Sequence, residues 1–535
     1  RTQLAGGQTL RIEKVASLYS SRDRAIYEPG LEARKAIRHW KGFAASIEAH
    51  EHLWRQIWDY FDIGLHYSKK NKPKEAQRIL RLHLFHTIQT ASPNTMDLDV
   101  GVPARGLHGE AYRGHVFWDE LFVFPLLNLR LPEITRALLH YRYRRLGEAR
   151  KTARDAGFRG AMYPWQSGSN GREESQRLHL NPRSGRWGPD YSRLQHHVGI
   201  AIAYNVWQHY QVTRDLEFLS FYGAEMFLEI ARFWASIARW STSRKRYEIR
   251  GVMGPDEYHE GYPGAEKPGI DNNAYTNVMA AWILARAPEL LSRLPCERRA
   301  ELCDSLDISD DELAHWDQIS RRVFVPFHDG DIISQFEGYE RLEPFDWEGY
   351  LRKYGDIQRL DRILKAEDDS PDRYQASKQA DVLMLFYLLS RKELEELFEH
   401  MGYSFDSTML IRNIDYYLQR TSDGSTLSRV VHSWVLVRED RPRSWHLFKT
   451  ALESDVHDVQ GGTTPEGIHL GAMAGTVDMV QRGYTGLVTR DDVLWLNPNL
   501  PREVGKIHLH LRYRGHFLRL NVSRDHVTVY SGASN

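Results

Sequence analysis

The chain has 535 residues, which is enough for a large core and for more than one domain. Its 71 Lys and Arg residues balance its 71 Asp and Glu residues, so no excess charge attracts nucleic acid or an anionic membrane. Aromatic residues make up 12% of the chain, a content that suits a sugar-binding cleft and equally suits an aromatic core.

Cysteine use and hydropathy indicate the compartment. The two cysteines, Cys296 and Cys303, lie in one helix-like stretch, which argues against a disulfide framework and favours a reducing compartment. We find no Cys and His spacing typical of zinc, no apolar run of membrane-spanning length and no signal peptide. We therefore expect a cytoplasmic protein without a metal.

The first part of the chain is predicted to pass from a strand through helices into a long loop. Apolar and polar residues alternate within 8–20, which is typical of a strand, and this strand is expected to be the last one of a larger domain. Apolar residues recur every three or four positions in 46–61 and in 74–90, which predicts two helices. The segment 91–120 is rich in Gly and Pro and is predicted to be a functional loop.

From residue 120 to about 490 the pattern is mainly helical, and each helical run is followed by a loop with Gly, Pro or Trp. This alternation suits a helical barrel or toroid whose loops form one active face. Beyond Asp492, two alternating runs at 507–513 and 518–522 flank an Arg-Gly turn, which predicts a hairpin of a small sheet domain. The predicted helical runs are 121–146, 194–212, 215–240, 272–290, 378–402 and 470–485.

The stretch 252–260, with the sequence VMGPDEYHE, is the central candidate for chemistry. Its Gly-Pro pair disfavours helix and strand, so Asp256 and Glu257 are expected on a loop, where catalytic groups are usually carried. A carboxyl group pressed against Tyr258 and other rings would be desolvated, and its pKa would rise toward that of a general acid. The alternative interpretation is a solvated acidic turn that caps a helix.

Three other stretches could hold a sugar. In 112–120 the ring of Trp118 precedes Asp119, and such a pair can stack on a sugar and accept hydrogen bonds from its hydroxyl groups. In 160–168 a proline places Trp165 on a loop. In each case a purely structural aromatic residue is the alternative. A further pair, Lys378 and Gln379, opens an apolar helix, where a lysine opposes the helix dipole; a sugar ligand or simple solvation would explain it.

Two stretches suggest an anion site. Small residues let backbone N–H groups face a ligand, and a helix N-terminus favours an anion. In the second stretch the small residues also allow tight helix packing, and the two interpretations are compatible. The candidate donors are Ser425, Ser428, Arg429 and His432 in 424–432, and Thr463, Thr464 and His469 in 461–476, where Glu466 also lies.

Taken together, these stretches resemble glycoside hydrolase family 65, the family of maltose, trehalose and kojibiose phosphorylases and related hydrolases. The resemblance implies a mainly α fold, with an (α/α)6 barrel catalytic domain at 91–490, the end of an N-terminal β-sandwich at 1–25, linker helices at 26–90 and a C-terminal β domain at 491–535. Six stretches carry it in the family's order: GHVFWDE at 114–120, YPWQSG at 163–168, GPDEYHE at 254–260, DNNAYTN at 271–277, SKQADVLML at 377–385 and EGIHLGAMAGT at 466–476.

The resemblance also implies inverting cleavage of an α-glucosidic bond. Glu257 matches the general acid of the family, which would protonate the glycosidic oxygen, and Asp256 would orient the loop or a sugar hydroxyl group. The residues that match those holding the non-reducing glucose are Trp118, Asp119, Lys378 and Gln379, and Trp165 is expected to add to that pocket.

The nucleophile is either phosphate or water. A hydrolase needs a second carboxylate about 6.5–9.5 Å from the acid to activate water, and Glu466 is the candidate. A phosphorylase needs only donors for phosphate oxygens. We expect phosphorolysis to β-glucose 1-phosphate and a free sugar, with inorganic phosphate as co-substrate and no other cofactor. The phosphate-binding candidates are Ser425, Ser428, His432, Thr463, Thr464 and His469.

Two alternatives stay open at this point: an inverting α-glucoside hydrolase with Glu466 as base, and a non-catalytic carbohydrate-binding homologue. The second sugar is expected to dock against the loops 257–270 and 330–350, with Tyr262, Trp347 and Tyr350 as candidates. The expected partner is a small-molecule α-glucoside, with neither nucleic acid nor membrane, and the chain is expected to form a homodimer.

Overall fold

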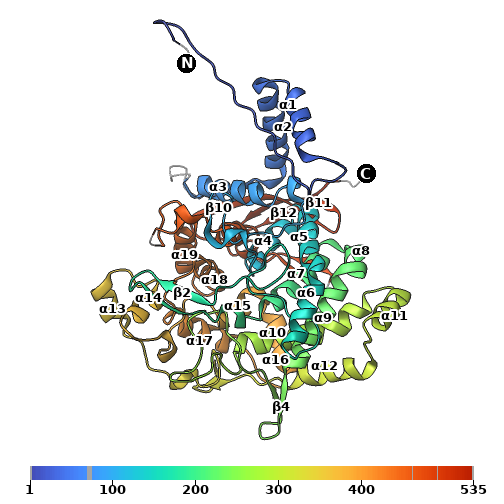
Figure 1. The fold of residues 1–535 in the computed structure, drawn as a ribbon. Coiled ribbons are helices and arrows are strands. Elements are labelled where there is room, and N and C mark those ends of the chain that lie inside the picture. The colour runs from blue at the N-terminus through green and yellow to red at the C-terminus, as the bar shows by residue number, and fades with distance from the viewer. Residues whose placement is uncertain (1–2, 69–74, 461, 491, 533–535) are drawn as a thin grey trace.

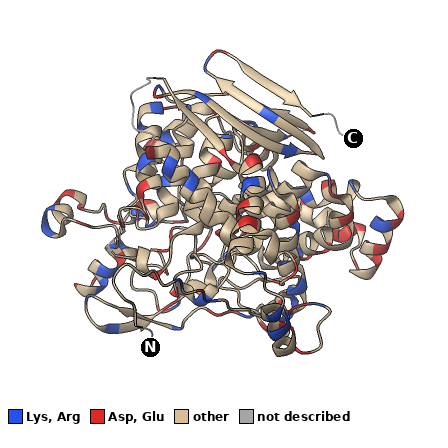
Figure 2. Cartoon of the chain, turned by 90° about the horizontal axis from the view of Figure 1, so that it is seen from above, with Lys and Arg blue, Asp and Glu red and all other residues tan. Residues whose placement is uncertain are grey.

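The computed structural model describes residues 3–68, 75–460, 462–490 and 492–532. The body of the molecule is helical, with an antiparallel sheet at one end of it (Figure 1). An arm of two helices, α1 (Pro29–Arg38) and α2 (Phe43–Phe61), extends from that end. Figure 2 shows positive and negative residues interspersed over the chain, in keeping with its zero net charge.

Within the described residues, six helices form a closed inner ring. Each contacts the next, and the last closes the ring against the first. Every residue of the first, fourth and sixth of these helices is buried, as expected for helices that are apolar on all sides. In ring order they are α4 (Glu120–Asn128), α7 (Val198–Thr213), α10 (Ala274–Ser292), α15 (Val382–Leu388), α18 (Thr426–Val435) and α20 (Leu470–Asp478).

A second layer of helices surrounds this ring. In this layer α5 packs on α4 and α7, and α9 packs on α7 and α10. Helix α12 packs on α10, and α17 packs on α15. Helix α19 packs on α18 and α20, and α3 packs on α20 and α19. This two-layered architecture confirms the predicted mainly helical fold and is consistent with an (α/α)6 barrel. The outer helices are α3 (Glu75–Thr90), α5 (Pro132–Arg144), α9 (Ala224–Ile237), α12 (Asp310–Arg322), α17 (Ser407–Leu418) and α19 (Arg441–Glu453).

The remaining helices and ribbons connect these layers. The helices are α6 (Leu146–Asp155), α8 (Leu216–Phe218), α11 (Cys296–Ser305), α13 (Trp347–Tyr354), α14 (Leu360–Ala366) and α16 (Arg391–His400). The two-stranded ribbons pair β2 (Leu178–Asn181) with β3 (Arg186–Pro189), β4 (Arg239–Ser241) with β5 (Arg246–Glu248), β6 (Phe327–His328) with β7 (Ile332–Ile333), and β8 (Val488–Arg490) with β9 (Val493–Trp495). No helix in the described ranges is both long and apolar enough to cross a bilayer.

The C-terminal sheet has four antiparallel strands in the order β1–β10–β11–β12. The predicted hairpin is confirmed: β10 (Val504–Tyr513) and β11 (His516–Ser523) are joined by Arg514 at φ +50° and Gly515 at φ +80°, a backbone suited to a two-residue primed turn. The outer strands are β12 (Val527–Ser531) and β1 (Ile63–Tyr67). Because β1 lies in the region predicted to contain linker helices alone, it is an unpredicted member of this sheet.

Three sequence predictions need correction. The strand predicted within 8–20 is wrong, because the described residues before α1 form no strand and a strand needs a paired neighbour. The helix predicted at 121–146 is divided into α4, α5 and the start of α6, since a proline begins α5. The helix predicted at 378–402 is likewise divided, because Ser390 forms a capping box that starts α16.

Candidate active site

The loops that precede the six inner helices line one cleft. It encloses about 1570 Å³ of space, open solvent included. Because each helix carries partial positive charge at its N-terminal end, a cleft at these ends favours anions and hydroxyl groups. Each of the six loops contributes at least one lining residue: Asp119, Ser192, Glu257, Gln379, Ser425 and His469.

Glu257 lies on a strained loop in this cleft. Its φ of +62° falls in the left-handed region that residues other than glycine rarely adopt. Lys378 donates a hydrogen bond from Nζ to one carboxylate oxygen at 2.5 Å, and Gln379 donates one from Nε2 to the other at 2.8 Å. The predicted aromatic surroundings need correction, because these two polar donors hold the carboxylate and the hydroxyl group of Tyr258 bonds instead to Ser422 at 2.7 Å.

Two buried acids, Asp256 and Asp381, support the Glu257 loop. Asp256 has no exposed surface and its Oδ2 lies 2.6 Å from Nδ1 of His259. Burial lowers the pKa of His259, but the charge and hydrogen bond of Asp256 outweigh it, and the net shift is upward. Asp381 accepts a hydrogen bond from Asn273 at 3.0 Å, and burial followed by the charge of Asp256 raises the pKa of Asp381 well above its usual value. The loop is thus anchored on a buried polar cluster.

Gly254 leaves no room for a side chain at the start of this loop. A Cβ atom there would lie 2.4 Å from Nδ2 of Asn273 and 2.5 Å from Oδ2 of Asp381. Gly254→Ala is therefore expected to displace the loop, lower kcat and reduce the free energy of unfolding by about 1–3 kcal/mol. Steady-state kinetics and chemical denaturation measure both effects. Gly261→Ala is the control, since its Cβ would meet only an ordinary contact at 3.5 Å; an equal loss in both variants would contradict the prediction.

Two tryptophans and an aspartate form a second wall of the cleft. Trp118 and Trp165 are buried except for their cleft edges, with ring centroids 6.0 Å apart. Glu173 holds the loop of Trp165 by accepting a hydrogen bond from its backbone N–H at 2.7 Å. Burial raises the pKa of Asp119 to about 7, and the charge of Glu257 adds to the shift. The structure thus brings the predicted glucose-binding residues to the cleft that holds Glu257.

The raised pKa of Asp119 predicts a pH effect on stability. The folded chain keeps this proton up to about pH 7, whereas the unfolded chain releases it near 3.8. Between these values the folded state binds more protons, so its stability falls as pH rises through this window. Asp119→Asn removes the titration. The Tm of the wild type relative to this variant is expected to fall between pH 4 and 7 and to level off above; a flat difference would contradict the shifted pKa.

One group of predicted anion-binding residues meets in the cleft. Ser425, Thr463 and His469 all line it. Nδ1 of His469 lies 2.8 Å from Oδ1 of Asp455, which fixes the ring. Arg105, which was not predicted from the sequence, donates a hydrogen bond to the carbonyl of Gly467 at 2.6 Å and has no carboxylate partner among the described residues. Its only sequence signal is its place in the Gly-rich loop before GHVFWDE.

Four other candidates do not line the cleft. Ser428 and His432 are buried in α18, and their Oγ and Nε2 atoms have no hydrogen-bond partner in the described part of the chain. Thr464 donates its hydroxyl hydrogen to Asp455 at 3.1 Å and so supports the loop of His469. Glu466 is exposed at the end of a short 3-10 helix, Thr464–Glu466. Its charge reaches the cleft residue Arg362, and its role as a base stays a prediction.

The outer wall of the cleft comes from segments that the sequence analysis did not select. The lining residues there belong to the β2–β3 ribbon, to the loop after β3 and to α14. Tyr262, Trp347 and Tyr350 do not line the cleft, which corrects their proposed role: Tyr262 donates to the carbonyl of Glu337 at 3.0 Å, and the other two rings pack on Phe345. The added lining residues are His179, Asn181, Asp190, Ser192, Arg359, Asp361, Arg362 and Lys365.

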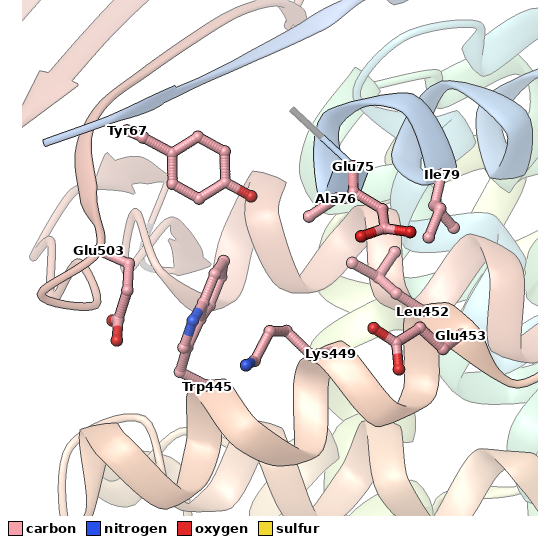
Figure 3. Close-up of a pocket in the computed structure, with 9 residues that line it drawn as sticks. All are labelled: Tyr67, Glu75, Ala76, Ile79, Trp445, Lys449, Leu452, Glu453 and Glu503. Carbon is pink, nitrogen blue, oxygen red and sulfur yellow. The ribbon is translucent and has the colours of Figure 1, made fainter. Parts of the chain in front are cut away.

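A separate hollow lies between α3, α19 and the C-terminal sheet (Figure 3). Trp445 and Lys449 come from α19, and Tyr67 comes from β1. Its carboxylates, those of Glu75 and Glu453 among them, surround a mainly apolar floor. It shares no lining residue with the cleft, and none of the motifs singled out above reaches it.

The closed ring of helices thus carries a carboxyl group, two tryptophan rings and hydrogen-bond donors suited to an anion in one cleft. Models of three domains of one family match the chain: the N-terminal domain at 1–57, the central catalytic domain at 81–478 and the C-terminal domain at 487–534. The chain belongs to glycosyl hydrolase family 65. The domain boundaries predicted from the sequence remain predictions.

Individual relatives agree with this family. An uncharacterised glycosyl hydrolase of Mycobacterium tuberculosis is 54% identical over 98% of this chain and 39% of its own length. Trehalose 6-phosphate phosphorylase of Lactococcus lactis is 38% identical over 91% of the chain and 61% of its own length. Kojibiose phosphorylase of Halothermothrix orenii is 31% identical over 98% and 66%. The chain therefore spans about two fifths to two thirds of the length of these relatives.

A solved structure confirms the fold. A protein from the human microbiome that carries a provisional kojibiose phosphorylase name superposes with a TM-score of 0.76. The match covers 95% of this chain and 68% of the other, at 23% sequence identity. The likeness extends over the barrel and beyond it, and it concerns the architecture alone.

Proposed function

We propose that the chain carries the active site of an inverting phosphorylase that cleaves an α-glucosidic disaccharide into β-glucose 1-phosphate and a free sugar. The observation that carries the proposal is the composition of the cleft. Glu257 stands there with donors suited to phosphate, those of Arg105, Ser425 and His469, while Glu466 is exposed and is not one of the lining residues. Relatives named as phosphorylases support the same reaction class.

In the proposed reaction a phosphate oxygen forms a bond to C1 of the glucose, and the bond from C1 to the glycosidic oxygen breaks. The electron pair moves to that oxygen, and protonated Glu257 donates its proton there. The new phosphate ester retains the proton of the attacking phosphate and can return it to Glu257, which restores the acid. Attack opposite the leaving group converts the α-linkage into a β-ester.

The residues around Glu257 would position the glucose and the acid. The rings of Trp118 and Trp165 would stack on the glucose, and Asp119 would accept hydrogen bonds from its hydroxyl groups. Lys378 binds the carboxylate of Glu257 in the free protein, and this charge raises the pKa of Lys378 although burial opposes it. Glu257 must release this contact and gain a proton before the bond breaks. An arriving phosphate offers Lys378 an alternative anion.

The test is a screen of α-linked glucose disaccharides, including trehalose, kojibiose, maltose and trehalose 6-phosphate, with and without inorganic phosphate. Release of β-glucose 1-phosphate that depends on phosphate supports the proposal. Unchanged turnover without phosphate would favour the hydrolase alternative. Binding without any product would favour the carbohydrate-binding alternative. The homodimer and the cytoplasmic location remain predictions.

A further inference from the structure

The helix α14 and the residue before it present three basic residues to the outer part of the cleft. Arg359 directly precedes the helix, whereas Arg362 and Lys365 lie within it at a spacing of three residues, and all three line the cleft. The helix contacts β2, next to which it lies in Figure 1. Asn181 of β2 fixes this contact by donating a hydrogen bond to the carbonyl of Arg362 at 3.0 Å.

Two of the three cations are neutralised within the protein. Arg359 donates two hydrogen bonds to the carboxylate of Asp361, at 3.1 and 2.8 Å. Lys365 binds the carboxylate of Glu260 at 3.2 Å. Burial raises the pKa of Glu260 to about 7 although Lys365 opposes the shift. These pairs leave little net charge for a ligand.

Arg362 is different. In the described part of the chain its side chain forms neither a hydrogen bond nor an ion pair, and its Nε atom is buried without a partner. Burial and the charge of Arg359 lower its pKa, while the charges of Asp361 and Glu466, neither of which forms an ion pair with it, oppose the shift. A half-buried, unpaired guanidinium group raises the free energy of the empty protein, and an anionic ligand would remove this cost. Its planar donors suit a phosphate group.

A second cation in the cleft, Arg105, also has no carboxylate partner in the described part of the chain. Arg105 lies with Thr463 and His469, on loops that precede α4 and α20. Arg362 lies on α14, among residues of the β2–β3 ribbon. Two guanidinium groups without a carboxylate partner, on two walls of one cleft, fit two anions rather than one.

We propose that Arg362 binds the phosphate group of a phosphorylated sugar, so that the leaving sugar of the disaccharide is anionic. This inference rests on the proposed phosphorolysis, which supplies the first anion, and in it the leaving sugar would extend toward the outer wall. It names Arg362 as a specificity-determining residue.

The test runs the reaction in reverse, with β-glucose 1-phosphate as donor and either glucose or glucose 6-phosphate as acceptor. The expected result is that kcat/KM is at least about 100-fold higher for glucose 6-phosphate, as two or more charged hydrogen bonds would give. Arg362→Gln is expected to raise KM for glucose 6-phosphate about 10- to 100-fold while KM for β-glucose 1-phosphate stays within about threefold.

Arg352→Gln is the matched control, since Arg352 is exposed on the neighbouring helix α13 and does not line the cleft. Equal use of both acceptors, or preference for glucose, would overturn the inference and leave phosphorolysis intact. An Arg362→Gln variant in which only the KM for inorganic phosphate rises, measured in the forward direction, would assign Arg362 to the attacking phosphate and also overturn it. Absence of reaction with every donor and acceptor would instead contradict the proposed function.

Discussion

Glu257→Gln is expected to lower kcat on the natural disaccharide by about 100- to 10 000-fold, because the amide cannot protonate the glycosidic oxygen. The amide keeps the shape of the side chain, but its single acceptor oxygen can accept from Lys378 or from Gln379 and not from both. Because the residues that would bind the sugar are unchanged, KM is expected to change much less than kcat. Steady-state kinetics in the presence of inorganic phosphate measure the effect. Full kcat in this variant would exclude Glu257 as the acid.

A substrate with a good leaving group separates loss of the acid from loss of the fold. Fluoride leaves without protonation, so α-glucosyl fluoride is expected to react with phosphate in Glu257→Gln at a rate within about tenfold of the wild type. Glu266→Gln is the matched control, since Glu266 is exposed on the same loop. A variant inactive on both substrates would indicate a structural role for Glu257 instead.

His469→Ala is expected to raise KM for inorganic phosphate about 10- to 100-fold, because a charged hydrogen bond contributes about 1.5–3 kcal/mol. The KM for the disaccharide is expected to stay within about threefold, since the glucose-binding residues lie on other loops. The backbone N–H of residue 469 still binds Asp455, so the loop keeps its anchor.

The control for this variant is His446→Ala, a substitution at an exposed histidine on α19. A Tm of His469→Ala close to that of this control would show that the fold is intact. If the disaccharide KM rises and the phosphate KM does not, His469 belongs to the sugar pocket and the assignment of the anion wall fails.

Sequence reasoning reached the inner part of the cleft because its residues stand in short local patterns. Glu257 follows a Gly-Pro turn, and Trp118 and Lys378 each stand at the start of a helix, where period and turn signals are strong. The closed ring also follows from periodicity, since helices buried on all sides are apolar throughout. These features depend on residues that are neighbours in the chain.

The outer wall depends on contacts between distant segments, and sequence patterns carry no signal for these. In the sequence, Arg362 is one of several charged residues in a helix. Its place at the cleft depends on a contact with a distant segment, in which its carbonyl accepts a hydrogen bond from Asn181. For Glu466 the reverse holds. It lies in a conspicuous sequence motif, yet the short helix that ends on it leaves its side chain exposed. Similarly, β1 is too short to be recognised without its partner β10.

The pairing of β1 with β10 has a consequence for how the chain folds. Ile63 of β1 pairs with Leu509 of β10, and all the helices of the barrel lie between these two strands in the sequence. On a ribosome β1 emerges long before its partner, and pairs of such large separation form slowly. We therefore expect the sheet to be the last part to assemble, after the barrel has brought the two ends together. During synthesis β1 would expose an unpaired edge, which makes this segment a candidate for chaperone protection or for misassembly between nascent chains.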